Sequence, residues 1–517
     1  MTRPYYVTTP IYYISGNPHI GHAYTTVVAD VLARSARTRG PAFMLTGTDE
    51  HGQKVANAAA AHGKTPQEWT DELVPRWQAL FAAYHVEYDD FIRTTQARHE
   101  TAVQAIFERM RQNGDVYLGT YEGWYCVSDE TFWLESKLAE GRCPTCGREV
   151  QWISEEDWFF RLSKYRDRLL AHYRANPQWV RPRSVYNEMM AILEEGLEDL
   201  SISRTNLEWG IPIPGPSAGS GRGVIYVWFD ALLNYVTALG WPDGERFRTF
   251  WPASVQLIGK EIARFHTLIW PSLLWSIGEA APELVFAHGW ITVEGQKIGK
   301  SLGNAVDPFA LAERFGADSM RYFLLREAPF GSDFSYSEEK IAQRHNNDLG
   351  NDLGNLLRRT LTMVQKYHSG IVPEPGERTS LSMRFADPST HLGERVAGLV
   401  TQLQFREALE AIWELVTALN RAIDERKPWN LHKEGRQHEL AALLYDLCQG
   451  LRWLAILLHP FMPERAAEMW RQLGARGRIE GDWRQSLAAW GDDGSLPPGT
   501  AVVPGDALFP RIDLVSA

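Results

Sequence analysis

Two histidines three residues apart are the first candidates for chemistry in this chain. They lie in Pro18-His19-Ile20-Gly21-His22, directly after an apolar, aromatic run and a Gly-Asn-Pro break. A strand-to-helix turn exposes backbone amides and the positive end of a helix dipole, both of which attract phosphate. The imidazoles of His19 and His22 can donate to phosphate oxygens at the same place. The alternative interpretation is a pair of surface histidines at the start of a helix.

A second candidate is the basic segment Lys297-Ile298-Gly299-Lys300-Ser301, which we expect in a glycine-rich loop after the last strand of a sheet. Two ammonium groups on a mobile loop can close over the charge that develops on a triphosphate attacked at its α-phosphorus. Taken alone, such a loop is usually only solvated. Together with the histidine pair, it indicates a site for a nucleoside triphosphate.

The elements around these motifs alternate between strand and helix. Apolar residues recur at helical spacing between residues 20 and 32, and several β-branched and aromatic runs read as strands of one sheet. These runs cover residues 5–13, 42–45, 224–229, 255–259 and 284–289. Alternation of this kind predicts an α/β fold with a parallel sheet. Residues 116–223 break the rhythm and are interpreted as an insertion, while the pattern after Asp307-Pro308 is that of a helical bundle.

Length and composition limit the class of protein. With 517 residues, 44% hydrophobic and 23% charged, the chain exceeds a single hydrophobic core and is not mainly disordered. Its 53 Lys and Arg against 64 Asp and Glu give a net charge of −11, so a nucleic-acid partner requires a local basic surface. Four cysteines are too few for a secreted disulfide scaffold. We find no signal peptide and no membrane-spanning run, and we expect a cytoplasmic protein with no membrane partner.

The histidine and lysine motifs, in this order on an interrupted α/β frame, resemble the HIGH and KMSKS motifs of the class I aminoacyl-tRNA synthetases. Further stretches of the sequence, between residue 5 and about residue 458, are similar to the methionyl-tRNA synthetase family. The matching stretches are Thr8-Thr9-Pro10-Ile11-Tyr12-Tyr13, Thr46-Gly47-Thr48-Asp49-Glu50-His51-Gly52, Leu200-Ser201-Ile202-Ser203-Arg204, Val227-Trp228-Phe229-Asp230-Ala231, Gly259-Lys260-Glu261-Ile262 and Lys427-Pro428-Trp429.

This resemblance implies a Rossmann-type parallel-sheet catalytic domain, split by a connective insertion with a zinc-knuckle-like element and followed by an all-α helical-bundle anticodon-binding domain. The implied domains are residues 1–115 (first catalytic half), 116–223 (connective insertion with knuckle), 224–295 (second catalytic half), 296–345 (lysine loop and stem-contact region) and 346–517 (helical anticodon-binding domain).

The implied reaction is attack of the L-methionine carboxylate on the α-phosphorus of ATP, followed by ester formation on the terminal ribose of tRNA. No side-chain nucleophile is needed. Positioning and charge stabilisation by His19, His22, Lys297, Lys300 and Mg²⁺ would supply most of the acceleration.

The resemblance also implies a methionine pocket in which Asp49 holds the substrate ammonium. Aromatic side chains suit a polarizable thioether, and the Tyr13 hydroxyl and a His266 nitrogen could donate to its sulfur. The alternatives are an ordinary aromatic core and, for Asp49, a helix cap. The implied pocket residues are Ile11, Tyr13, Trp228, Ala231, Leu232, Tyr235, Ile262, His266 and Trp270.

The implied ATP contacts lie in the histidine motif, at the ends of two later strands and in the lysine loop. They are His19, Gly21, His22, Gly259, Glu261, His288, Gly289 and Lys300. The family usually has Asp where Glu261 stands, and Met and Ser where Ile298 and Gly299 stand. We therefore expect a more flexible lysine loop with activity retained.

The insertion holds a set of metal-ligand residues, Cys126, Asp129, Cys143 and Cys146. Zinc accepts carboxylate oxygen as well as thiolate, and related synthetases carry a zinc knuckle here, so one structural Zn²⁺ is expected. The alternative is a relic knuckle without metal.

Two regions are candidates for contact with tRNA. The segment 161–183 could bind the acceptor end, or could be a solvated helix face; its basic residues are Arg161, Lys164, Arg166, Arg168, Arg174, Arg181 and Arg183, against the single acid Asp167. In the helical part, Asn355, Arg359 and Trp429 match positions at which the family reads the CAU anticodon of methionine tRNA.

Two other functions remain to be weighed. The chain could be a tRNA-binding paralogue with weakened catalysis, since its lysine loop and knuckle are altered, and a methionine-dependent exchange of pyrophosphate into ATP would separate the two. A synthetase for leucine or cysteine is disfavoured by the absence of a large editing insertion and of a thiol cluster near Tyr13. No further RNA-binding barrel follows the helical part, so we expect a monomer.

Overall fold

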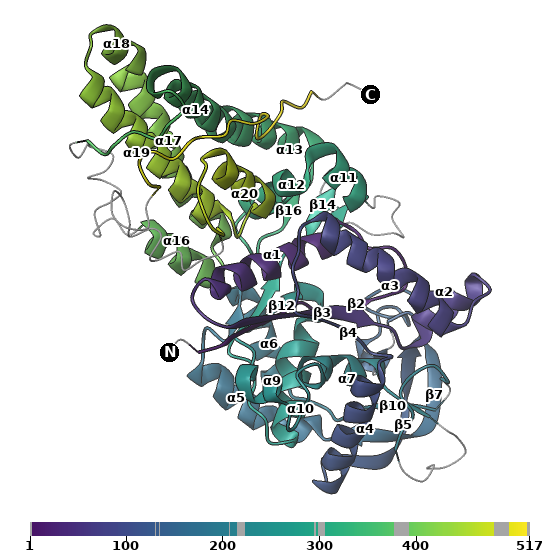
Figure 1. The fold of residues 1–517 in the computed structure, drawn as a ribbon. Helices are drawn as coiled ribbons and strands as arrows, with labels where there is room; N and C mark the ends of the chain where they lie inside the picture. The colour runs from purple at the N-terminus through teal and green to yellow at the C-terminus, as the bar shows by residue number, and fades with distance from the viewer. Residues whose placement is uncertain are drawn as a thin grey trace.

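The computed structural model describes residues 3–129, 131–133, 135–205, 207–214, 223–293, 296–297, 306–376, 392–479 and 496–513. Figure 1 shows an α/β part around a central sheet and, at the opposite end of the molecule, a part made mainly of helices. Helix α1 (Ile20–Arg37) runs between the two parts and is buried along most of its length.

A seven-stranded sheet forms the centre of the α/β part, and every pairing in it is parallel. Strand β3 pairs with β4 on one edge and with β1 and β2 on the other, so the chain winds outward in both directions from β1. Ligands bind at the carboxyl ends of strands at such a switch point. The strands are β1 (Tyr5–Thr8), β2 (Tyr12–Tyr13), β3 (Ala42–Asp49), β4 (Asp90–Arg93), β8 (Val180–Arg181), β12 (Val255–Gly259) and β13 (Val285–His288).

Helices cover both faces of this sheet, as the alternating sequence pattern predicted. They are α1, α2 (Gln53–Ala61), α3 (Pro66–Ala83), α4 (Ala97–Gln112), α5 (Arg166–Ala175), α6 (Arg183–Glu195), α7 (Val227–Leu232), α8 (Asn234–Thr237), α9 (Glu245–Phe250) and α10 (Trp270–Ser276). A 3₁₀ turn at Lys260–Ile262 and a π-helix at Phe265–Ile269 precede α10.

The insertion forms an antiparallel sheet in which the long strands β5 (Val116–Cys126) and β7 (Gln151–Phe160) are central. Strands β6 (Thr131–Trp133) and β9 (Leu200–Ser201) flank them, with 3₁₀ turns at Glu135–Lys137 and Leu162–Tyr165. The insertion is not wholly separate from the catalytic sheet, because β8 lies within it and pairs with β13.

The prediction of a strand at residues 224–229 is wrong for most of that range. Only β11 (Val224–Ile225) is extended, and it pairs with β10 (Ser203–Arg204) in a separate two-stranded sheet. From Val227 onward the chain is the helix α7. A short continuous apolar run is compatible with a buried strand or a buried helix, and here tertiary contacts decide for the helix.

The helical part follows β14 (Ile291–Val293) and β15 (Gln296–Lys297), which form a small sheet with β16 (Phe334–Ser335) from farther along the chain. Lys297 is therefore strand backbone, and not loop as expected. The helices are α11 (Pro308–Phe315), α12 (Ala317–Arg326), α13 (Glu338–Arg344), a π-helix (His345–Gly354), α14 (Asn355–His368), α16 (Leu392–Thr401), α17 (Phe405–Arg426), α18 (Pro428–Lys433), α19 (Gln437–Leu458) and α20 (Pro463–Gln472).

Helix α19 corrects one statement made from the sequence. It is long and apolar enough to cross a membrane by length and composition, whereas the sequence analysis found no such run. In the fold, 94% of that window is buried among the other helices, which is how a core helix behaves. Cys448 lies in this buried stretch.

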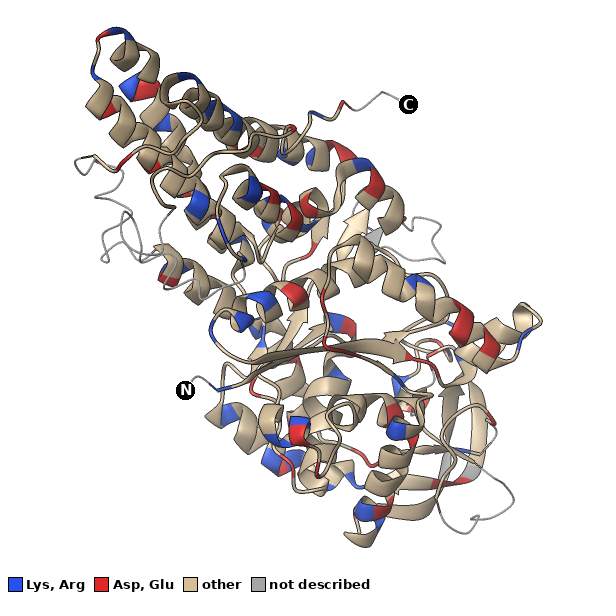
Figure 2. Cartoon of the chain, in the orientation of Figure 1, with Lys and Arg blue, Asp and Glu red and all other residues tan. Residues whose placement is uncertain are grey.

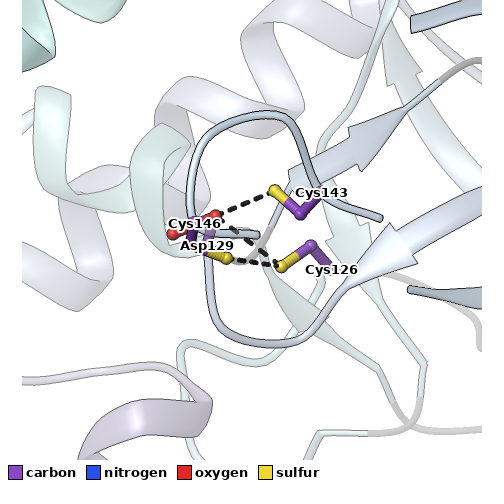
Figure 3. Close-up of side chains that lie close together, drawn as sticks. All are labelled: Cys126, Asp129, Cys143 and Cys146. Atoms are coloured by element: carbon purple, nitrogen blue, oxygen red, sulfur yellow. Dashed lines mark hydrogen bonds between the residues drawn. The ribbon is translucent and has the colours of Figure 1, made fainter. Parts of the chain in front are cut away.

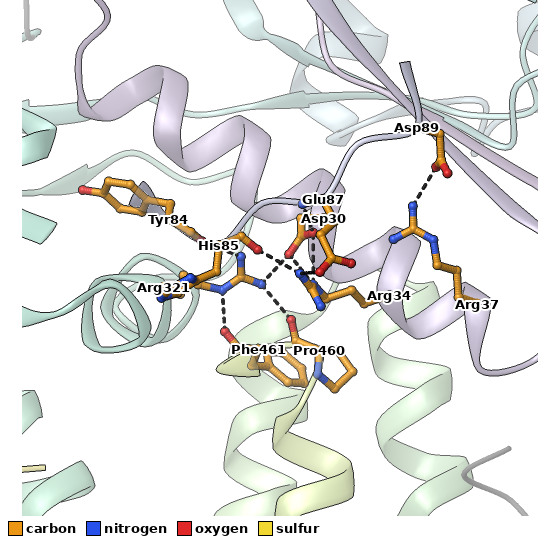
Figure 4. Close-up of polar contacts among 10 residues, drawn as sticks. All are labelled: Asp30, Arg34, Arg37, Tyr84, His85, Glu87, Asp89, Arg321, Pro460 and Phe461. Carbon is orange, nitrogen blue, oxygen red and sulfur yellow. Dashed lines mark hydrogen bonds and ion pairs between the residues drawn. The ribbon is translucent and has the colours of Figure 1, made fainter. Parts of the chain in front are cut away.

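A buried ionic network joins the two parts of the molecule (Figure 4). Arg321 on α12 has no exposed surface, and its Nη2 lies 2.6 Å from the carboxylate of Asp30 on α1. The same guanidinium donates to the carbonyls of Tyr84, Pro460 and Phe461. Arg34 is the second cation on Asp30, at 2.9 Å. We call Arg321, Asp30 and Arg34 the junction network.

Candidate active site

The histidine motif forms the amino-terminal end of helix α1. His19 is the N-cap, and its Nδ1 accepts from the backbone N–H of Gly21 at 3.1 Å. The Nδ1 of His22 accepts from the backbone N–H of His19 at 3.0 Å, which completes a capping box. The two rings stack with their centroids 3.7 Å apart. A Cβ atom at Gly21 would lie 2.9 Å from the His19 ring, so any other residue here would have to displace that ring.

These caps determine which ring nitrogens can serve a ligand. Because each Nδ1 accepts from a backbone N–H, each neutral ring carries its proton on Nε2. The sequence analysis expected backbone amides of this turn to attract phosphate. Those of His19 and Gly21 already donate to the rings, so these two amides do not serve a phosphate.

The carboxyl ends of β12 and β13 lie beside α1. Gly259 and His288 are paired across the two strands, and the His288 Nε2 lies 2.7 Å from the hydroxyl of Thr25 on α1. The His288 Nδ1 faces the Gly289 carbonyl at 2.8 Å, and burial lowers the pKa of His288, so its ring stays neutral near pH 7. This contact places three expected ATP residues next to the helix that carries the histidine motif.

Two glycines and Glu261 complete this edge. A Cβ atom at Gly259 would lie 2.6 Å from a Glu261 carboxylate oxygen, and one at Gly289 would lie 2.4 Å from the Ser332 backbone. Glu261 accepts from the Trp290 indole N–H at 2.9 Å. The Glu261 side chain is therefore held in place by an aromatic partner.

A cavity of about 170 Å³ opens at the carboxyl ends of the first strands. It collects side chains from β2, β3, α7, α8 and the turn before α10. Nine of the ten residues expected for an amino-acid pocket line it: Ile11, Tyr13, Asp49, Trp228, Ala231, Leu232, Tyr235, Ile262 and His266. A small, mainly apolar cavity with the Asp49 and Asp129 carboxylates at its wall fits an amino acid with an apolar side chain.

Trp270 is the expected pocket residue that does not line the cavity. It is fully buried, packs against the Tyr235 ring with centroids 5.7 Å apart, and donates its indole N–H to the Gln256 side chain. Trp270 therefore supports Tyr235 from behind.

Four lining residues were not assigned to the pocket from the sequence: Pro10, Lys54, Asp129 and Val227. Lys54 lies five residues after Asp49 and could have been found from that stretch. Asp129 comes from the cysteine-rich insertion, and no local signal in the sequence places it beside residues more than a hundred positions away. A further neighbour, Phe265, stacks on Trp228 with centroids 3.9 Å apart.

The hydrogen bonds of His266 correct the expectation that it donates to a thioether. Its Nδ1 lies 3.1 Å from the Ile262 carbonyl, which can only accept, so Nδ1 carries the proton. Burial lowers the pKa of His266 to about 4, so the ring is neutral at pH 7 and Nε2 has no proton. Nε2 accepts from the Tyr235 hydroxyl at 2.8 Å. His266 thus orients Tyr235.

The lysine loop falls largely outside the described residues. The backbone of Lys297 is part of β15, but its side chain, and all of Ile298, Gly299 and Lys300, are not described. The expectation of a flexible loop stays a prediction.

The four expected metal ligands lie together beside the pocket (Figure 3). Cys126 ends β5, and Cys143 and Cys146 lie in a turn whose flanking glycines have positive φ angles. One ligand atom from each of Cys126, Asp129, Cys143 and Cys146 lies within 4.8 Å of all the others. The Asp129 carboxylate is 3.0 Å from the Cys143 sulfur.

Within this cluster the pKa of the Asp129 carboxyl is lowered, whereas the pKa values of the Cys126 and Cys146 thiols are raised. Burial would raise the pKa of Asp129, but hydrogen bonds from Cys143 and Cys146 keep it below its usual range. Burial and the Asp129 carboxylate raise the pKa of Cys146 to about 12. Without a cation the thiols of Cys126 and Cys146 stay protonated, so a divalent metal would have to displace their protons to bind.

The three expected anticodon residues lie on α14 and α18, and Figure 1 shows α18 at the end of the helical part that is remote from the sheet. Asn355 and Arg359 lie one turn apart on α14, and Arg359 pairs with Asp424 near the end of α17 at 2.8 Å. Trp429 follows on α18 and is 43% exposed, unusual for an indole. A large exposed aromatic side chain is typical of a surface that stacks bases.

The basic segment 161–183 is engaged mostly within the protein. Figure 2 shows Lys and Arg along α5. Arg161, Arg168 and Arg183 lie over the rings of Tyr117, Trp275 and Tyr186, each about 4 Å from the centroid. Lys164 pairs with Asp115, while Arg166 pairs with Asp167. Arg174 is exposed, and Arg181 is half-buried in β8.

Comparison with known proteins agrees with this geometry. A family model described as tRNA synthetases class I (M) matches residues 5–152 and 148–361, and one described as the anticodon-binding domain of tRNA ligase matches residues 390–497. The chain is 47% identical to methionine–tRNA ligase of Caldanaerobacter subterraneus subsp. tengcongensis and 46% identical to that of Thermotoga maritima. The matches cover 99% and 98% of this chain and 80% of each relative.

The chain belongs to the methionyl-tRNA synthetase family of class I tRNA synthetases.

A solved member of the methionyl-tRNA synthetase family has the same fold. Methionyl-tRNA synthetase of Mycobacterium tuberculosis, in complex with methionyl-adenylate, superposes with a TM-score of 0.92 at 43% identity. The match covers 99% of this chain and all of that one. The resemblance read from the sequence is confirmed, as is the fold class of a Rossmann-type catalytic domain with a helical anticodon-binding domain.

Proposed function

We propose that this chain ligates L-methionine to tRNA through methionyl-adenylate. The methionine carboxylate attacks the α-phosphorus of ATP, the bond to the departing pyrophosphate breaks, and the ribose hydroxyl of tRNA then displaces AMP from the adenylate. Family membership over almost the whole chain supports this reaction. The single observation that carries it is the small apolar cavity with Asp49 at its wall, at the same sheet edge as the His19–His22 stack.

We assign methionine recognition to the cavity residues. Asp49 receives the ammonium group, and Trp228, Ala231 and Leu232 contact the side chain. The Tyr235 hydroxyl donates to His266, which fixes the orientation of both side chains. We propose that this rigid polar edge of the pocket accommodates a branched side chain poorly. We keep Trp270 as a supporting residue behind Tyr235.

We assign phosphate stabilisation to the Nε2–H groups of His19 and His22, which their caps orient. Lys297 and Lys300 add charge from the lysine loop during attack. Mg²⁺ supplies charge neutralisation on the ATP phosphates when it is bound. Gly259, Glu261, His288 and Gly289 line the nucleoside side, where the missing Cβ atoms allow close backbone approach.

A zinc ion suits the Cys126, Asp129, Cys143 and Cys146 set. Three sulfurs and one carboxylate within 4.8 Å of one another match a closed, four-coordinate zinc site. Bound zinc would supply a cross-link between the two turns of the insertion. We expect about one zinc per purified chain, and tighter retention against a chelator in Asp129→Cys than in wild type. Metal analysis finding well under one zinc per chain would support the relic knuckle.

We assign anticodon recognition to Asn355, Arg359 and Trp429, with stacking of an unpaired base on Trp429. For the acceptor end, segment 161–183 is a weaker candidate, since most of its guanidinium groups are engaged within the protein. We also propose that the domains follow the boundaries expected from the sequence and that the protein acts as a cytoplasmic monomer. Light scattering tests the oligomeric state.

Methionine-dependent exchange of pyrophosphate into ATP tests the function. We expect exchange with methionine and much less with leucine, cysteine or homocysteine. Exchange absent with every amino acid, together with tRNA binding, would instead support a tRNA-binding paralogue with weakened catalysis.

A further inference from the structure

A buried carboxylate behind the amino-acid pocket is not used by the reaction described above. Asp230 lies on α7 and has no exposed surface. One of its oxygens accepts from the Nδ1 of His51 at 2.7 Å, and the other accepts from the Nε2 of His99 at 2.6 Å. We call His51, Asp230 and His99 the histidine network.

The network lies on the opposite face of α7 from the cavity. Trp228, Ala231 and Tyr235 recur at helical spacing and line the cavity, while Asp230 lies between them in sequence and points the other way. The second nitrogen of His99 lies 2.7 Å from the hydroxyl of Thr237, which follows on α8. His99 therefore holds both short helices from behind.

The other end of the network reaches the opposite wall. His51 follows Asp49 by two residues at the end of β3, and its ring packs against Trp209 with centroids 5.3 Å apart. The Trp209 indole donates to the carbonyl of Glu50 at 2.7 Å. A single carboxylate thus joins the wall that carries Asp49 to the wall that carries Trp228.

Charge favours this arrangement. Burial would raise the pKa of Asp230, but His51 and His99 keep it below its usual range. Burial would lower the pKa of His51, but Asp230, with smaller contributions from Glu100 and Glu50, raises it. Glu100 faces the second ring nitrogen of His51 at 3.9 Å. An ionised Asp230 with two imidazole donors is therefore stable in the interior.

We propose that Asp230, held by His51 and His99, is a positioning residue for methionine: it fixes the distance between Asp49 and the α7–α8 wall. α7 and α8 are only six and four residues long and have little rigidity of their own. This inference rests on the proposed function. The polar side-chain partners of the network within the described part of the chain are Thr237 and Glu100, and neither belongs to the nucleotide-side strands β12 and β13, so its loss affects methionine and not ATP.

The test combines three substitutions with methionine binding by calorimetry and KM values from pyrophosphate exchange. Asp230→Asn leaves one histidine N–H facing an amide N–H, and His51→Leu removes a donor. We expect both to raise the methionine Kd and KM roughly 10–100-fold and to leave the ATP KM within about twofold. His51→Asn keeps a donor at the position of Nδ1 and should recover most of the affinity.

Asp115→Asn is the matched control. Asp115 is also buried, follows the far end of α4, and accepts from the hydroxyls of Tyr165 and Ser276. We expect this change to lower the melting temperature without changing methionine affinity. Should Asp230→Asn fail to fold, His99→Leu against His99→Gln, which keeps a donor at Nε2, makes the same comparison.

Folded Asp230→Asn and His51→Leu proteins that bind methionine as wild type does would overturn the positioning role. So would an equal loss of affinity in Asp115→Asn, because the effect would then be one of general stability. A wild-type protein without methionine-dependent exchange would instead contradict the proposed function. Exchange by the wild-type protein is therefore measured before the variants are compared with it.

Discussion

Asp230 and Asp30 are two carboxylates with no exposed surface, and the protein neutralises them differently. Asp230, behind the pocket, is held by two histidines that each offer one donor to it. Asp30, at the junction of the two parts, is held by two arginines. Arg321 uses its further donors on carbonyls from three other positions in the chain.

The difference follows from the chemistry of the two cations. Arginine keeps its charge at every physiological pH and carries five donors, so one side chain can tie several segments of two domains. Histidine is compact, has two ring nitrogens and titrates near neutrality. It fixes short distances near the pocket but makes that region sensitive to pH. Arginine therefore suits a permanent junction, and histidine suits local positioning.

The largest effect is expected from Arg321→Gln. This change leaves Asp30 buried with only Arg34 as a cation and leaves three carbonyls without their donor, so we expect a loss of about 3–5 kcal/mol in the free energy of unfolding. Urea denaturation measures it. The exposed pair Arg395–Glu414 is the control, since Arg395→Gln should cost less than about 1 kcal/mol. Equal losses in both variants would remove the distinction between the junction and an ordinary surface pair.

A substitution in the pocket wall should have the opposite effect to Arg321→Gln and weaken methionine kinetics more than stability. Asp49→Asn removes the charge that receives the substrate ammonium, and losing a hydrogen bond to a charged group costs about 1.5–3 kcal/mol, or roughly 10–150-fold in kcat/KM for methionine. We expect the free energy of unfolding to change little. If Asp49→Asn lowers stability but spares methionine kinetics, Asp49 has a structural role and does not receive the ammonium.

Trp429 extends the comparison to the far end of the helical part. Stacking of a base on an aromatic ring is worth about 1–3 kcal/mol, so Trp429→Ala should lower aminoacylation at subsaturating tRNA by roughly 5–150-fold. Pyrophosphate exchange, which needs no tRNA, should be unchanged. Unchanged aminoacylation in this variant would withdraw the anticodon assignment.

The smallest effect is expected on the pH dependence of the unfolding free energy. The pKa of His51 is higher in the folded protein than its ordinary value of 6.5, so its stabilising contribution is complete below that value and is lost as pH rises through the folded pKa. The difference in unfolding free energy between wild type and His51→Asn should therefore shrink as the pH rises above the ordinary value of about 6.5. The effect of Arg321→Gln should stay constant over that range. A constant His51 difference would mean that the ring is neutral throughout.

The residues that sequence reasoning located best are those with local signals. The His19–His22 turn, the parallel strands and the apolar faces of the long helices follow from spacing over a few residues, and nine of ten expected pocket residues line the cavity. Three expectations went wrong where the deciding contact is distant. Val227–Leu232 is a helix, Trp270 lies behind Tyr235, and His266 accepts from Tyr235.

The sequence by itself determined the family, the alternation of strands with helices and the residue types of the pocket, because motif spacing and hydrophobic period are properties of neighbouring residues. Only the tertiary structure decided which side chains are buried together. Asp230 meets His51 across 179 positions, and Arg321 meets Asp30 across 291. Such pairs form because a buried carboxylate must find donors, and which donors it finds depends on how the chain packs.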